Sequence, residues 1–263
     1  MTKLQLAVIG GVLSLFFVLY FGCDTKPVEQ KELEKSRALA TESTNIQVLQ
    51  QEAKAEMSND QLSEIASIDF QLQAAEDDSS RIETLKSLSG KWYQLGYPAI
   101  AGYYAQEIAE QLSTAESWSI TGTTFTLCIQ QSTQEKVRDF CTGRAINAFE
   151  SAISLAPSEM SNRVNLALVY TENPPSENPM KGILMLRDLN EEDPENVIVL
   201  NSLGRLAIKT GQYERAVERL EQAFNSDPGN INTICLLANA YQGAGEIEKA
   251  EAFKQQCRQA SGQ

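Results

Sequence analysis

Apolar residues between Leu200 and Asn230 fall into two series with helical spacing, separated by the turn sequence T-G-Q-Y. With Val197 as position 1, the apolar or small residues stand at positions 4, 7, 8, 11, 20, 24 and 27: Leu200, Leu203, Gly204, Ala207, Ala216, Leu220 and Ala223. Pro228 follows at position 32. Each series lies on one face of a helix, and glycine and proline are typical of helix ends. The segment therefore predicts two helices joined by a turn.

The same pattern recurs along the chain. A shift of 34 residues to Ile231 finds apolar or small residues again at positions 4, 7, 8, 11, 20 and 27: Ile234, Leu237, Ala238, Tyr241, Ala250 and Cys257. Gly245 stands at position 15, as Gly211 does in the unit that begins at Val197. Frames that begin at Met160, Ala115 and Ile82 extend the pattern toward the N-terminus, with insertions of three residues in ENPPSENPM and of eleven in the second frame. The sequence thus predicts five helical hairpins, over residues 82–114, 115–159, 160–196, 197–230 and 231–263.

One unit carries a recognisable signature: Trp118, Gly122, Phe125, Ala145, Phe149, Ala152 and Pro157. This spacing resembles the tetratricopeptide repeat. The resemblance implies an all-α solenoid, in which small residues let paired helices approach and large ones fill the gap to the next hairpin. It also implies a right-handed superhelix over residues 82–263. Residues 61–81 are expected to hold a capping helix at Leu62–Leu72.

The N-terminus predicts attachment to a membrane. Leu4–Gly22 carries no charge and is long enough to cross a hydrocarbon core of about 30 Å. Residues 1–23 are either a retained single-pass anchor or a lipoprotein-type signal with Cys23 as the lipidated residue; the exit sequence argues against simple cleavage. Residues 24–60 are rich in Glu, Lys, Gln, Ser and Ala and are expected to form a charged, partly helical linker. Long downstream domains translocate largely regardless of charge, so we expect the body to lie outside the cytoplasm.

Composition excludes several classes of partner and of chemistry. The 35 acidic and 22 basic residues give a formal net charge of −13, which disfavours nucleic acid and anionic surfaces as partners of the body. The chain contains no histidine, the commonest general base and nitrogen ligand. No catalytic constellation, phosphate loop or metal motif is found. We therefore expect no enzymatic activity, cofactor, metal or small-molecule substrate.

The resemblance implies that the first helices of successive units line a concave groove. The residues mapped to its face are mostly polar: Val164, Asn165, Asn201, Arg205, Lys209, Asn232, Asn239 and Gln242. Asparagine amides can pair with an extended peptide backbone, and Arg205 and Lys209 could take a carboxylate. The carboxylate clamp for chaperone tails is not matched. The alternative is that these residues are only solvated helix faces.

The cysteines outside the N-terminus divide into two groups. Cys128 and Cys141 bracket an insertion and could form a disulfide in an oxidising compartment. Cys257 occupies a core position and Cys235 lies near the groove, and both are interpreted as small packing residues.

Two functions remain open. The first is a membrane-tethered scaffold that binds a protein or peptide in its groove. The second is a structural or assembly subunit of an envelope complex that acts through self-association as a homo-oligomer. The sequence does not name the partner.

Overall fold

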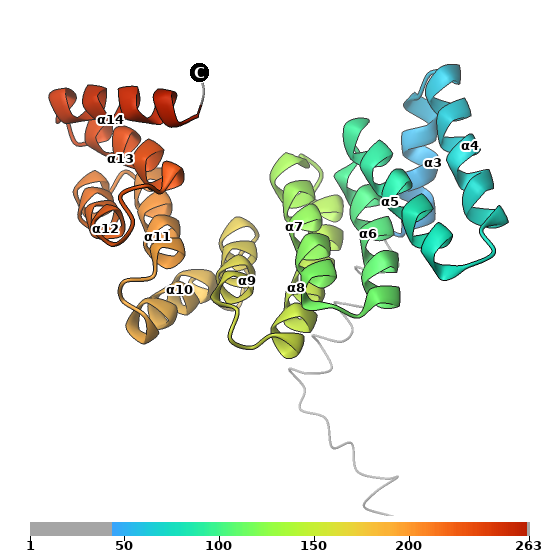
Figure 1. Ribbon diagram of the computed structural model, residues 1–263, viewed down its shortest axis with the longest axis horizontal. Coiled ribbons are helices and arrows are strands. Elements are labelled where there is room, and N and C mark those ends of the chain that lie inside the picture. The colour runs from blue at the N-terminus through green and yellow to red at the C-terminus, as the bar shows by residue number, and fades with distance from the viewer. Residues whose placement is uncertain (1–43, 262–263) are drawn as a thin grey trace, which may run out of the picture. The chain divides into compact units, whose positions relative to one another are not determined.

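The computed structural model describes residues 44–261, which form twelve α-helices and no strand (Figure 1). In chain order the helices are α3 (Ile46–Glu56), α4 (Asn59–Ala74), α5 (Asp78–Gln94), α6 (Pro98–Leu112), α7 (Ala115–Gln131), α8 (Glu135–Leu155), α9 (Met160–Glu172), α10 (Lys181–Glu192), α11 (Val197–Lys209), α12 (Tyr213–Ser226), α13 (Ile231–Gly243) and α14 (Ile247–Ala260). None of these helices is long and apolar enough to cross a membrane. The expected span at Leu4–Gly22, and Cys23 after it, lie outside the described residues.

Helices α5 to α14 pack as five successive hairpins, each against its neighbours along the chain. Four of the hairpins begin at Ala115, Met160, Val197 and Ile231, the residues from which the sequence frames were counted. The first begins at Asp78, four residues before the expected start, because Asp77 caps it: its side chain accepts the backbone N–H of Ser80 at 2.9 Å. The eleven-residue insertion lengthens both helices of its hairpin: α7 has 17 residues and α8 has 21, against 13 and 14 for α11 and α12.

Tight turns within the hairpins depend on glycine. Gly96, Gly211 and Gly245 have φ values of 86°, 73° and 79°, in the left-handed region that other residues rarely adopt. Each follows the first helix of its hairpin, so the chain can reverse within three residues. This reversal sets the register in which the second helix meets the first.

Large side chains lie directly on small residues of the adjacent helix. A Cβ atom added at Gly204 of α11 would stand 2.6 Å from Cγ of Leu220 in α12, and one added at Gly122 of α7 would stand 2.7 Å from the Phe149 ring in α8. Leu220 and Phe149 are buried. Because protein interiors are close-packed, the absence of a side chain at these glycines determines how near the helices can come.

The last part of the segment expected to be a partly helical linker, residues 46–56, is a helix that packs on the folded unit. Ile46, Leu49 and Ala53 of α3 are buried, and α3 packs against α6. The Gln50 side-chain amide also donates a hydrogen bond to the Tyr104 hydroxyl at 3.0 Å. An apolar stripe of three residues is too short to distinguish a docked helix from a solvated one by sequence. The folded unit therefore includes α3, and α4 spans the expected capping helix.

Two disulfides join the helices of two hairpins. Cys128 of α7 is bonded to Cys141 of α8, and Cys235 of α13 to Cys257 of α14, with Cα–Cα distances of 6.1 and 5.0 Å. The interpretation of Cys235 and Cys257 as packing residues is therefore wrong. They are 22 residues apart in sequence, and only the register of the hairpin brings them together. No motif in the sequence encodes that distance.

The two disulfides should differ in their resistance to reduction. Cys128 and Cys141 are 2% and 0% exposed, whereas Cys235 and Cys257 are both half-buried. Thiol exchange needs access to a sulfur atom, so a mild dithiol should reduce Cys235–Cys257 first. Timed alkylation followed by peptide mass spectrometry measures both rates. Equal rates, or earlier loss of Cys128–Cys141, would contradict the prediction.

Two glycine-to-alanine substitutions should have opposite effects on stability. Gly204→Ala places a methyl group against Leu220 and should lower the free energy of unfolding by about 1–3 kcal/mol. Gly143→Ala adds its methyl group in open space on an exposed helical position and should raise the free energy of unfolding by about 0.5–1 kcal/mol. Denaturant unfolding of both variants is the measurement. A stabilising Gly204→Ala would show that helix approach is not limited there.

Candidate functional site

The first helices of the last three hairpins surround a hollow of about 470 Å³. Helix α11 contacts both α9 and α13, so one continuous surface runs across three repeats. The lining residues come from these helices and from the loop before α13: Val164, Asn165, Leu168, Val197, Ile198, Asn201, Ser202, Arg205, Asp227, Asn230 and Asn232. We call this recess the inner hollow.

The inner hollow combines apolar contact area with a single free cation. Ile198, which is 48% exposed, lines the hollow together with Leu168. Arg205 is exposed and forms no ion pair with any residue between 44 and 261. The Asp227 carboxylate already accepts the Gly229 backbone N–H at 3.1 Å. The hollow therefore presents the Arg205 guanidinium together with the apolar side chains of Ile198 and Leu168.

Asn201 connects two repeats and does not point freely into the hollow. It is 5% exposed, and its Oδ1 accepts the Thr233 hydroxyl at 2.9 Å. Its Nδ2 donates to Oδ1 of Asn230 at 3.5 Å. These bonds link α11 to the start of α13. The sequence did not single out Thr233, because the partner of a buried amide depends on how successive repeats stack.

The other groove candidates separate into two sets. Asn165, half-buried, and Asn232, exposed, line the hollow with Arg205. Lys209, Asn239 and Gln242 do not line it. Lys209 instead forms an ion pair with Glu172 of α9, with Nζ and Oε2 3.2 Å apart. The structure thus brings Asn165, Asn201, Arg205 and Asn232 together.

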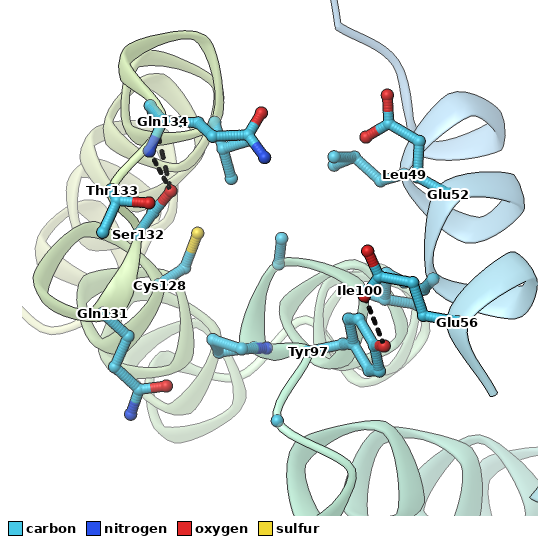
Figure 2. Close-up of a pocket in the computed structure, with 15 residues that line it drawn as sticks. Leu49, Glu52, Glu56, Tyr97, Ile100, Cys128, Gln131, Ser132, Thr133 and Gln134 are labelled. Atoms are coloured by element: carbon cyan, nitrogen blue, oxygen red, sulfur yellow. Dashed lines mark hydrogen bonds between the residues drawn. The ribbon is translucent and has the colours of Figure 1, made fainter.

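A second recess of about 260 Å³ lies at the other end of the array, and we call it the N-terminal cleft. Figure 2 shows α3 on one side, with Leu49, Glu52 and Glu56, and the loop between α7 and α8 opposite. The start of α6, at Pro98–Ile100, forms its floor. Cys128, which lines the cleft, is one half of the disulfide that ties α7 to α8. The cleft was not predicted, because its first wall lies in the expected linker.

Most polar groups of the N-terminal cleft already have partners. Glu52 pairs with Lys136 of α8 at 3.4 Å, and Glu56 accepts the Tyr97 hydroxyl at 3.3 Å (Figure 2). Burial raises the pKa of Tyr97, and the charge of Glu56 raises it further, so the hydroxyl remains a donor at neutral pH. These contacts hold α3 in place. The cleft is therefore better explained as a docking contact of α3 than as a ligand site.

A family model described as "Tetratricopeptide repeat" matches residues 207–256, from the end of α11 to α14. The hairpins outside this range repeat the same helix pairing and the same small-on-large contacts. Residues 207–256 are therefore a tetratricopeptide repeat segment.

Solved structures of tetratricopeptide repeat proteins resemble this chain at low sequence identity. TTC0263 of Thermus thermophilus, titled a thermophilic TPR protein, is 14% identical with a TM-score of 0.50, covering 69% of this chain and 92% of that one. PilW, titled a type IV pilus biogenesis factor, is 16% identical with a TM-score of 0.46 over 69% and 78%. MamA from Desulfovibrio magneticus RS-1 is 16% identical with a TM-score of 0.41 over 71% and 97%. No curated protein matches the sequence. The similarity to TTC0263 shows the tetratricopeptide fold alone.

Loss of the Asn201 side chain should destabilise the repeat array. Asn201→Ala removes one acceptor of the buried Thr233 hydroxyl, but Oδ1 of Asn230, 3.2 Å from that hydroxyl, still accepts its hydrogen bond. The free energy of unfolding should therefore fall by about 1 kcal/mol. Asn232→Ala, on an exposed position of the same hollow, should leave stability unchanged. Denaturant unfolding compares the two; equal stabilities would mean that the α11–α13 link contributes nothing.

Proposed function

We propose that this protein is a non-catalytic, membrane-tethered scaffold that binds an extended segment of a partner protein in the inner hollow. The tetratricopeptide fold is a protein-interaction scaffold whose stacked repeats create extended concave surfaces. The observation that carries the proposal is the set of unengaged groups in the hollow: the Arg205 guanidinium and the Asn165 and Asn232 amides beside exposed Ile198.

These groups suit a peptide. The two amides can donate to and accept from a peptide backbone without specifying its side chains. Ile198 and Leu168 offer contact area to one apolar side chain, while Arg205 favours a carboxylate nearby. Asn201 contributes by holding α11 against α13, so that the two walls of the hollow keep their spacing.

The location of the body outside the cytoplasm is part of the same proposal. The cytoplasm keeps thiols reduced, and stable disulfides belong to oxidising compartments. Two disulfides within repeat hairpins therefore support an extracytoplasmic body. Tethering rests on the uncharged segment Leu4–Gly22, either as a retained span or through lipidation of Cys23.

One observation favours self-association as the second candidate. Only one residue of α14, Ala250, is buried, and Ile247 at its start is 64% exposed. A second copy could cover this surface. Light scattering of the full chain in detergent, with the micelle contribution subtracted, separates the alternatives: a monomer that retains partner binding speaks against assembly through this face.

Removal of the unengaged groups should abolish partner binding without unfolding the array. The variant Asn165→Ala, Arg205→Ala, Asn232→Ala tests this, because none of the three is fully buried. Quantitative co-purification from membranes of the cells that make the protein is the measurement, with a loss of at least tenfold expected.

The matched control is Asn147→Ala, Lys254→Ala, Gln255→Ala, which removes three exposed polar side chains from α8 and α14. It should bind like the unaltered chain, and circular dichroism should be the same for both triples. Undiminished co-purification with the first triple would reject the inner hollow as the binding site.

A further inference from the structure

Three arginines lie on second helices of neighbouring hairpins, Arg187 on α10 and Arg215 and Arg219 on α12. Arg215 and Arg219 are four residues apart on α12, which places them on the same helix face. One turn further on, the Gln222 side-chain amide donates a hydrogen bond to the Pro194 carbonyl at 3.0 Å, two residues beyond the end of α10. This face of α12 therefore lies against the loop after α10, and the charge of Arg187 on α10 acts on Arg219. We call Arg187, Arg215 and Arg219 the outer arginine patch.

Ion pairing within the described residues does not explain the patch. None of its three guanidiniums forms an ion pair with a described residue, although acidic residues outnumber basic ones by 35 to 22 in the chain. Arg215 donates to the Gln212 amide oxygen at 2.7 Å, which is a neutral partner. Like charges held close together cost free energy unless an opposite charge offsets them. Although the chain has many carboxylates, none in its described part forms an ion pair with these arginines to offset their repulsion.

The surroundings of Arg219 define the local charge. Partial burial lowers the pKa of Arg219, and the charges of Arg215 and Arg187 lower it further, while Glu218 is the one carboxylate that raises it. Arg219 therefore has two neighbouring guanidiniums and one neighbouring carboxylate. The patch is a cationic spot on an otherwise acidic protein, and it does not overlap the lining of the inner hollow.

We propose that the outer arginine patch binds a short acidic segment of a second partner protein, with aspartate or glutamate carboxylates paired to Arg187, Arg215 and Arg219. The guanidinium group presents a planar fork of donors that matches a carboxylate in two parallel hydrogen bonds. The half-buried Arg219 has less side-chain freedom to lose than an exposed arginine. This site is separate from the proposed groove function and does not depend on it.

The overall charge favours a short segment over an extended polyanion. A membrane surface or a nucleic acid would bring its charges within about 8 Å, the Debye length at physiological ionic strength, of carboxylates beyond the patch. The formal charge of −13 makes that contact repulsive. A segment of a few acidic residues reaches the patch and avoids most of those carboxylates.

The test is fluorescence anisotropy of the full chain in detergent with a labelled peptide that carries four consecutive glutamates between Gly-Ser flanks. The chain should bind this probe, and binding should weaken as salt rises. The variant Arg187→Gln, Arg215→Gln, Arg219→Gln should lower the affinity at least tenfold. The same three positions changed to lysine should retain part of the affinity, because lysine keeps the charge but loses the fork.

Two controls make the outcome specific. The variant Arg138→Gln, Lys254→Gln, Arg258→Gln changes the net charge equally at dispersed positions and should leave affinity unchanged within twofold. Arg205→Gln should also leave it unchanged, which separates this proposal from the groove proposal. No binding by the unaltered chain, equal loss in the dispersed control, or loss with Arg205→Gln would each overturn the proposal. Patch-dependent binding to vesicles with anionic lipids, without peptide binding, would assign the patch to a membrane instead.

Discussion

The close approach of paired helices at small residues is the constraint on which the rest of the structure depends. Gly204 under Leu220 and Gly122 under Phe149 bring the helices of two hairpins to a distance that a Cβ atom would prevent. A hairpin packed in this way still exposes one apolar face, and only the next hairpin covers it. Stacking follows from this, and the first helices of the last three hairpins come to line one surface.

That surface owes its polar character to the positions between the packing residues. Within α11, Leu203, Gly204 and Ala207 are buried, while Arg205 alternates with them and remains exposed. The Asn201–Thr233 bond shows a further consequence, since an amide at a surface position became a buried contact between repeats. Binding and packing roles therefore cannot be separated by position in the repeat alone.

Much of the fold follows from sequence periodicity, because the spacing of small and large residues determines how the paired helices pack. The starts of α7, α9, α11 and α13 coincide with the frames for this reason. Three features did not follow. The docking of α3 depends on its contact with Tyr104 of α6, and the Cys235–Cys257 bond depends on hairpin register. The outer arginine patch depends on how α12 meets the loop after α10. Each is a contact between helices or loops, and sequence periodicity predicts the individual helices but not which of them touch.

The candidate site could be predicted from the sequence about as far as the fold could. The resemblance to the tetratricopeptide repeat implied that Asn165, Arg205 and Asn232 face a groove, and all three line the inner hollow. The sequence could not predict which of these side chains already have a partner within the protein. Lys209, for example, forms an ion pair with Glu172 of another repeat.

The central claim is that a partner segment lies in the inner hollow, and site-specific photo-crosslinking tests it most directly. A photoreactive amino acid is placed at Asn165, at Asn232 or, as the reference, at Glu248 on the exposed side of α14. Irradiation in the cells that make the protein should give one and the same adduct from Asn165 and Asn232 and none from Glu248. An adduct from Glu248 alone, or different adducts from the two inner positions, would contradict the account.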